Sequence, residues 1–131
     1  MKKGQLLNQP ISAIVAGMGH MDELAIADAG LPIPSATPRI DLALTQDVPR
    51  FVDTVRVVLT ELQVERAVVA EEMRDVSPTV FEAIKALLGD APIETVPHES
   101  FKARTESATA VIRTGEFTPY ANIILIAGVV F

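Results

Sequence analysis

The chain has 131 residues, a length typical of one compact domain, and we expect residues 1–131 to form a single domain. Hydrophobic residues make up 49% and charged residues 21%, a composition that can close a core and argues against disorder. The formal net charge of -6 at pH 7 repels phosphate backbones and anionic lipids, so we expect neither nucleic acid nor a membrane as a partner.

Cysteine is absent, which excludes disulfides, thiolate nucleophiles and cysteine-ligated metal sites. No run approaches the roughly 20 apolar residues that span a bilayer. The basic first residues are followed by an apolar stretch that Asn8, Gln9 and Pro10 interrupt before the core of a signal peptide can form. The sequence therefore predicts a cytoplasmic protein.

The first third of the chain predicts one helix, one strand and a loop. Apolar residues recur at helical spacing after Pro10, and glycines at 17 and 19 end this helix. Residues 24–27 form a short apolar run typical of a buried strand. Three prolines between residues 31 and 38 predict an ordered but irregular loop, a place where function often lies.

The middle of the chain continues the alternation of strands and helices. Residues 40–44 alternate as in a strand, and an apolar stripe over residues 51–62 predicts an amphipathic helix. Residues 67–70 follow as another buried strand. Ser77 and Pro78 then begin a helix that ends at Gly89.

The last third predicts a strand at 93–96, a short helix at 99–104, a strand at 110–113 and a final strand at 123–130. Helices that alternate with short apolar strands favour an α/β fold. We therefore predict one three-layer domain with a largely parallel or mixed sheet flanked by helices.

The two histidines, His20 and His98, both lie where a predicted element meets a loop, the position where sites collect in α/β folds. Each also has a structural explanation. An imidazolium at His20 would complement the carbonyl end of the first helix, and His98 would be a polar residue at the entry to a short helix.

Asp28 directly follows the strand at 24–27, so its carboxylate emerges at a strand end, although an Asx turn before Gly30 explains it equally well. Residues 115–122 carry the only tyrosine, and their polar groups can converge on a ligand or merely form a turn before the last strand. Asp41 and the pair at 71–72 are expected to face solvent.

Common catalytic motifs are missing. The sequence has no glycine-rich phosphate loop, no GxSxG elbow and no HExxH pair. No spacing of histidines and carboxylates demands a metal, so neither a metal site nor a cofactor is predicted.

Seven segments of the chain resemble the D-ribose pyranase family, and the resemblance extends from residue 1 to residue 131. These segments are Met1-Lys2-Lys3-Gly4, Gly19-His20, Asp28-Ala29-Gly30-Leu31-Pro32-Ile33-Pro34, Arg39-Ile40-Asp41, His98-Glu99, Val111-Ile112-Arg113-Thr114-Gly115-Glu116 and Tyr120-Ala121-Asn122. Each segment alone is weak, but several in the right order and at the right separations are specific.

The resemblance implies a cytoplasmic, cofactor-free isomerase that interconverts the pyranose and furanose forms of D-ribose and supplies the furanose to ribokinase. It implies a ring-shaped homo-oligomer, a decamer, with sites near the subunit interfaces. It also implies that His20 is the acid/base residue. The sugar-binding residues that it implies are Asp28, His98, Tyr120, Ala121 and Asn122.

The residue types suit this chemistry. Histidine donates and accepts protons at neutral pH, which is what opening a hemiacetal ring requires. Asp28 either holds the tautomer of His20 or binds a sugar hydroxyl, and the sequence leaves both roles open.

Three other functions remain open. A mutarotase for another monosaccharide such as L-fucose would share His20, but the segments at 28–34 and 118–122 resemble fucose mutarotases less closely. The other two are a non-catalytic sugar-binding module and a purely structural oligomer.

Overall fold

One mixed sheet of six strands runs through the computed structural model, which describes residues 1–131. Its spatial order is β2-β5-β1-β6-β3-β4. In chain order the strands are β1 (Glu23–Ala27), β2 (Arg39–Asp41), β3 (Val64–Ala70), β4 (Ile93–Val96), β5 (Ala110–Arg113) and β6 (Ile123–Ala127). Neighbouring strands pair in parallel, except that β6 lies antiparallel between β1 and β3. Five strands therefore point the same way, and their carboxyl ends meet at one edge of the sheet.

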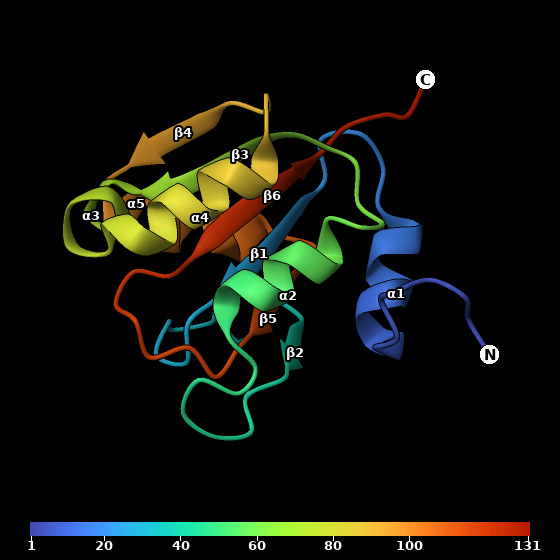
Figure 1. Ribbon diagram of the computed structural model, residues 1–131, viewed down its shortest axis with the longest axis horizontal. Coiled ribbons are helices and arrows are strands. Elements are labelled where there is room, and N and C mark those ends of the chain that lie inside the picture. Colours follow the sequence, from blue (N-terminus) through green and yellow to red (C-terminus); the bar gives the residue numbers. More distant parts are fainter.

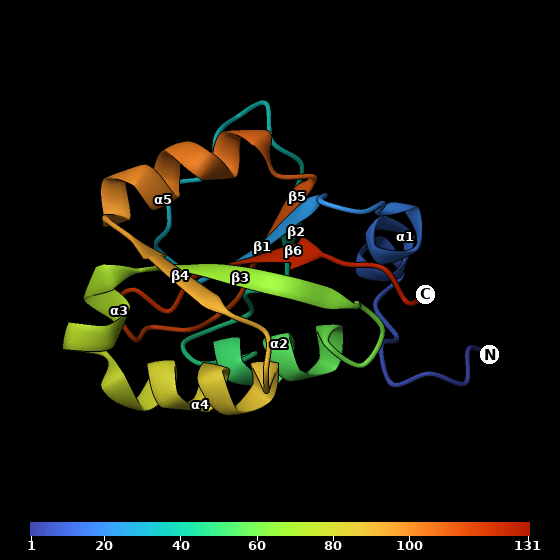
Figure 2. The same cartoon turned by 90° about the horizontal axis from the view of Figure 1, so that it is seen from above.

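Helices cover both faces of this sheet. The helices α2 (Phe51–Val58) and α4 (Pro78–Leu88) lie on one face and α5 (His98–Arg104) lies on the other (Figure 2). A short α3 (Glu71–Val76) joins β3 to α4, and α1 (Gln9–Gly17) lies beside the sheet at the end where both termini are found (Figure 1). The predicted three-layer α/β architecture is confirmed. None of the helices is long and apolar enough to cross a membrane.

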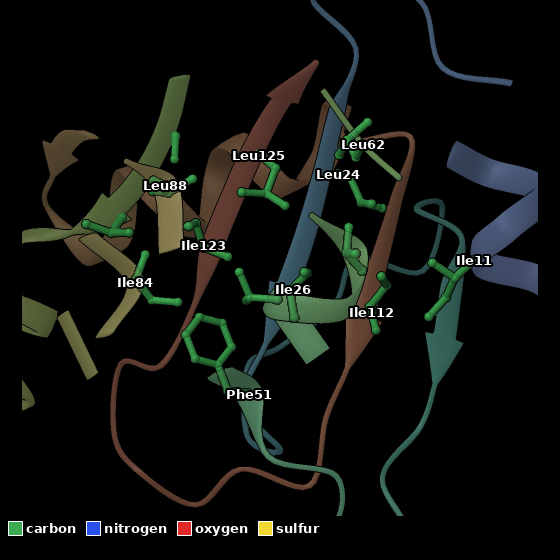
Figure 3. Packing of buried hydrophobic residues seen from close by; sticks show 14 of the residues in the cluster. Ile11, Leu24, Ile26, Phe51, Leu62, Ile84, Leu88, Ile112, Ile123 and Leu125 are labelled. Atoms are coloured by element: carbon green, nitrogen blue, oxygen red, sulfur yellow. The ribbon is translucent and has the colours of Figure 1, made fainter. Parts of the chain in front are cut away.

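The core forms because the side chains of each buried strand alternate between the two faces. On β1, Leu24 and Ile26 pack under α2 and α4, whereas Ala25 and Ala27 face α5. Figure 3 shows the larger of these two layers, in which Phe51 of α2 meets residues from several strands. Burial of each large aliphatic or aromatic side chain stabilises the fold by about 1.5–3 kcal/mol, so the sheet is a rigid base for the loops at its edge.

Several predicted boundaries differ from the structure for local reasons. The second strand ends at Asp41 rather than residue 44, because the carboxylate of Asp41 accepts a hydrogen bond from the N–H of Ala43 and turns the chain. The helix predicted to reach residue 62 ends at Val58, where the hydroxyl of Thr60 donates to the carbonyl of Val57. The last strand ends at Ala127 rather than residue 130.

One helix was not predicted. Glu71 and Glu72 were expected to close a strand and face solvent, but they begin α3. Two acidic residues in the first turn complement the positive end of a helix, and this signal was available in the sequence. Glu72 also accepts a hydrogen bond from the backbone N–H of His98, so α3 helps to place the start of α5.

Candidate functional site

A cavity of about 540 Å³ opens at the carboxyl edge of the sheet. In open α/β sheets this edge is where ligands bind, and the volume is in the range of small-molecule sites. The lining residues come from the turn after β1, the start of α5, the end of β5 and the loop before β6. They are Asp28, Ala29, Gly30, Leu31, Pro32, His98, Arg113, Glu116, Phe117, Thr118, Pro119 and Tyr120.

Asp28 is fixed by Asn122 through two reciprocal hydrogen bonds. The side-chain amide of Asn122 donates to Oδ2 of Asp28, and its carbonyl oxygen accepts from the backbone N–H of Asp28, both at 2.9 Å. Oδ1 of Asp28 accepts from the N–H of Gly30 at 2.9 Å. Each carboxylate oxygen keeps a second lone pair, so Asp28 is oriented and still able to accept a hydrogen bond from a ligand hydroxyl.

His98 and Tyr120 form an aromatic corner of the cavity. Their ring centroids lie 5.0 Å apart at an interplanar angle of 85°, an edge-to-face contact. Nδ1 of His98 is buried and has no hydrogen-bond partner in the protein. Unpaired buried polar atoms are rare and costly in native proteins, so an unpaired imidazole nitrogen on a lining residue is typical of a binding site.

Arg113 lines the cavity, but its charge is largely directed elsewhere. Its Nη1 donates to both carboxylate oxygens of Asp41 at 3.2 Å, and its Nε donates to the carbonyl of Ala29 at 3.0 Å. Partial burial acts to raise the pKa of Asp41, but the N–H of Ala43 and the guanidinium of Arg113 outweigh it and hold the pKa below its ordinary value.

The loop before β6 is held at several points around the cavity. The hydroxyl of Ser77 donates to the carbonyl of Pro119 at 2.6 Å. The N–H of Ala121 donates to the carbonyl of Thr118, and Tyr120 has a positive φ of 61 degrees. These hydrogen bonds fix the backbone of the loop, and the loop in turn places Tyr120 at the cavity.

Four of the residues predicted for the site gather at this edge: Asp28, His98 and Tyr120 line the cavity, and Asn122 lies directly behind Asp28. Ala121 and Asn122 are fully buried and do not line it. The side-chain amide of Asn122 is occupied by Asp28, and the methyl group of Ala121 packs in the core.

His20 lies elsewhere in the chain's own structure. It precedes the amino end of β1, whereas Asp28 follows the carboxyl end, and a five-residue strand is about 17 Å long. Nε2 of His20 is 2.7 Å from Oε2 of Glu65, and the His20 side chain is 52% exposed. The imidazole thus contacts a carboxylate of β3, not the carbonyl end of α1 that the structural explanation invoked.

Sequence reasoning did not assign Arg113, Glu116 or Thr118 to the site. The signal for Arg113 was its position at the end of a buried strand, the same signal that singled out Asp28. Glu116 and Thr118 lie within the turn at 115–122, which was singled out only as a whole. No three His, Cys, Asp or Glu side chains are placed together to hold a metal ion.

Comparison with known proteins places this geometry in a family. Residues 1–130 match the model of the RbsD / FucU transport protein family. The D-ribose pyranase of Coprothermobacter proteolyticus is 55% identical over 131 residues, and that of Vibrio parahaemolyticus is 56% identical over 139 residues. Each alignment covers the whole of both chains.

Solved structures agree with the sequence matches. Bacillus subtilis RbsD complexed with D-ribose superposes with a TM-score of 0.97 at 46% identity, over the full length of both chains. The fucose mutarotase of Streptococcus pneumoniae in complex with L-fucose has a TM-score of 0.81 at 24% identity, which shows a shared fold. Full-length agreement in sequence and in fold leads to one conclusion: this chain belongs to the RbsD / FucU family.

Proposed function

We propose that this protein is a D-ribose pyranase, an isomerase that interconverts the pyranose and furanose forms of D-ribose. The observation that carries the proposal is that Asp28, His98 and Tyr120 line one cavity at the carboxyl edge of the sheet. Relatives at 50–56% identity over the full chain bear that name, and the B. subtilis neighbour was solved with D-ribose.

The reaction needs only proton transfers. A base takes the proton of the anomeric hydroxyl, an acid protonates the ring oxygen, and the bond between that oxygen and the anomeric carbon breaks to give the open-chain aldehyde. A different hydroxyl of the sugar then attacks the aldehyde, and the protons move in the reverse sense. No carbon has a changed oxidation state at the end, so the chemistry calls for no redox cofactor.

The cavity residues supply recognition for this reaction. Asp28 accepts hydrogen bonds from sugar hydroxyls, with Asn122 holding its carboxylate in place. Tyr120 offers an aromatic edge and a phenol, and His98 offers a ring nitrogen. Ala121 contributes through its backbone, which fixes the turn that carries Tyr120.

His20 is the proton-transfer residue in this proposal, and it acts in the cavity of a neighbouring copy. Two features support this assignment: His20 lies at the opposite end of β1 from Asp28, and its side chain is 52% exposed, so that a second copy can reach it. Met21, two residues before β1, is exposed, and so are Val130 and Phe131 at the C-terminus, which lies at the same end of the molecule as α1 (Figure 1). Head-to-tail contacts form a ring when the rotation between successive copies closes, which is compatible with the ring-based homodecamer that the family resemblance implies.

In the cell, such an enzyme acts on free ribose before the sugar is phosphorylated. We place it in the cytoplasm, where a ribokinase consumes the furanose.

Saturation-transfer NMR on the anomeric protons of D-ribose tests this function. The native protein is expected to accelerate pyranose–furanose exchange, and His20→Ala is expected to lose about 10²–10⁴-fold, the usual contribution of a positioned acid/base group. Lys85→Ala, which changes an exposed residue of α4, is the control and keeps the native rate.

Other outcomes point to other functions. Acceleration with L-fucose but not with D-ribose identifies a mutarotase for another sugar. Binding of ribose with an unchanged exchange rate identifies a sugar-binding module, and no binding of either sugar leaves a structural oligomer.

A further inference from the structure

Glu116 is a buried carboxylate at the cavity wall that no cation neutralises. Only 7% of the residue is exposed, and it forms none of the ion pairs of the chain. Burial of a charge without a partner is expensive unless hydrogen bonds and dipoles compensate for it. The surroundings of Glu116 therefore have to supply that compensation.

Three donors meet the carboxylate of Glu116. Oε2 accepts from the backbone N–H of Phe51 at 3.1 Å. Oε1 accepts from the hydroxyl of Thr118 at 2.7 Å and from the backbone N–H of Thr118 at 3.2 Å. Phe51 is the first residue of α2, so the positive end of that helix adds to the compensation.

The backbone of Glu116 also forms hydrogen bonds, and these reach the other side of the cavity. Its carbonyl accepts from the N–H of Ala29 at 2.9 Å, directly after Asp28. Its N–H donates to the hydroxyl oxygen of Thr114, and that hydroxyl donates to the carbonyl of Ala27 at 2.7 Å. Glu116 thus joins the Asp28 turn, the start of α2 and the loop that carries Tyr120.

We propose that Glu116 is a positioning residue of the sugar site: it sets the place of Tyr120 relative to Asp28 by holding Thr118 and Ala29 at once. This inference rests on the proposed function, because it names a residue on which ribose affinity depends. Glu116 acts through Thr118 and the backbone, and it takes no part in the proton transfers.

A side chain with two acceptor oxygens is required because two backbone N–H groups and one hydroxyl donate to it. A glutamine at 116 has one acceptor oxygen, and its amide NH₂ would then face a backbone N–H of either Thr118 or Phe51. One of those buried donors then loses its partner, which is costly in a buried position. The hydroxyl of Thr118 can rotate to accept from the new amide, but the backbone N–H cannot.

The chain offers a direct reporter of this geometry. Tyr120 is the only tyrosine and there is no tryptophan, so near-ultraviolet circular dichroism and fluorescence at the tyrosine bands report Tyr120 alone. Both signals are measured on the full-length protein in its native assembly, without sugar and during a titration with D-ribose.

The test compares Glu116→Gln with Glu82→Gln, the same change at an exposed glutamate of α4 that forms none of the ion pairs of the chain. Glu116→Gln is expected to change the Tyr120 dichroism without sugar and to raise the ribose Kd and KM by about 10-fold, the equivalent of one lost buried hydrogen bond. The rate at saturating ribose is expected to stay within about 3-fold of native, and its pH profile to be unchanged, because the proton-transfer group is untouched. Glu82→Gln is expected to leave all of these values at the native level.

Thr118→Val and Thr118→Ser supply the second comparison, in case Glu116→Gln does not fold. Valine removes the hydroxyl donor and keeps the backbone N–H. We therefore expect the Tyr120 dichroism and the ribose Kd to change in the same direction as in Glu116→Gln, but by less. Serine restores the hydroxyl and is expected to restore the native dichroism and Kd.

The inference is overturned if Glu116→Gln folds with native Tyr120 dichroism and native Kd. It is also overturned if Glu116→Gln does not fold and Thr118→Val is indistinguishable from native. A loss at saturating ribose with unchanged Kd also overturns it, because Glu116 would then act on the chemistry. If the native protein itself does not bind ribose, the proposed function fails, while the sugar-free dichroism still decides whether Glu116 positions Tyr120.

Discussion

Asp28 and Asn122 are the most tightly matched pair of side chains at the cavity. Residue 122 is fully buried and gives both an acceptor and a donor to residue 28, and the two residues are 94 positions apart in the chain. An amide does both from two separate atoms, whereas an ionised carboxylate has no donor and a hydrophobic side chain has neither. The identity of residue 122 is thus determined by its hydrogen bonds to residue 28.

Asn122→Asp is expected to weaken ribose binding strongly and to destabilise the fold by about 1–3 kcal/mol. The change removes the donor to Oδ2 of Asp28 and places a second carboxylate 2.9 Å from it in a buried position. Urea unfolding and a ribose titration followed by Tyr120 fluorescence measure the two effects.

Asn8→Asp is the matched control. Asn8 caps α1 by accepting from the N–H of Ile11, and aspartate does the same at a helix N-terminus. The same substitution is therefore expected to be nearly neutral there. Equal effects at the two positions would contradict the role given to Asn122.

At the scale of the elements, the edge strand β2 depends on one ion pair next to the cavity. β2 has only three residues, and its last residue, Asp41, lies in register with Arg113 at the end of β5. The guanidinium of Arg113 also donates to Ala29 in the turn after β1. This pair therefore connects the outermost strand to the wall of the site.

Asp41→Asn is expected to remove a pH-dependent contribution to stability. The pKa of Asp41 is lower in the folded protein than its ordinary value, so its contribution is present above the unfolded pKa and is lost as pH falls through the folded pKa. The difference in unfolding free energy between native and Asp41→Asn is expected to be greatest above the unfolded pKa and to decrease as the pH falls through the folded pKa. Because the carboxylate is partly exposed, the size is that of a surface ion pair, about 1 kcal/mol or less.

Urea unfolding at several pH values measures this difference, with Asp90→Asn, an exposed residue after α4, as the control. If the difference in unfolding free energy between native and Asp41→Asn grows as the pH falls, the expected direction of the pH dependence is wrong.

At the scale of the whole molecule, the residue proposed for proton transfer lies far from the residues proposed for sugar binding. His20 and Asp28 lie at opposite ends of β1, and a single chain cannot bring them together without breaking the sheet. If His20 is the proton-transfer residue, as proposed, a complete site requires two copies of the chain. A stable monomer with every site residue intact is expected to be inactive.

Subunit mixing tests this directly. His20→Ala and Asp28→Asn are each expected to be inactive, but oligomers formed by unfolding and refolding an equal mixture are expected to regain activity. If each site takes His20 from one copy and Asp28 from the next, about a quarter of the sites in a random mixture are intact. An inactive mixture that has refolded into the native assembly would show that both residues act from the same chain. Size-exclusion chromatography with light scattering checks the assembly.

The sequence by itself determined most of the secondary structure and the class of fold. The apolar runs at 24–27 and 67–70, and the run at 110–113 up to its final Arg113, are buried strands because β-branched, aliphatic and small residues without charges have no other stable place in a chain of this size. Some boundaries it missed, such as the end of β2 at Asp41 and the end of α2 before Thr60, depend on side-chain hydrogen bonds that compete with the regular backbone hydrogen bonds. These bonds follow from local geometry that periodicity does not encode.

The candidate site divides in the same way. Residue type and position at element ends, together with the family resemblance, were enough to single out Asp28, His98 and Tyr120. Only the tertiary structure decided that Asn122 forms hydrogen bonds to Asp28 and that His20 lies at the far end of β1. It also decided that Glu116 is a buried carboxylate without an ion-pair partner. The physical reason is the sheet itself: its strand order sets which ends of which strands meet, and that order depends on contacts between residues far apart in the sequence.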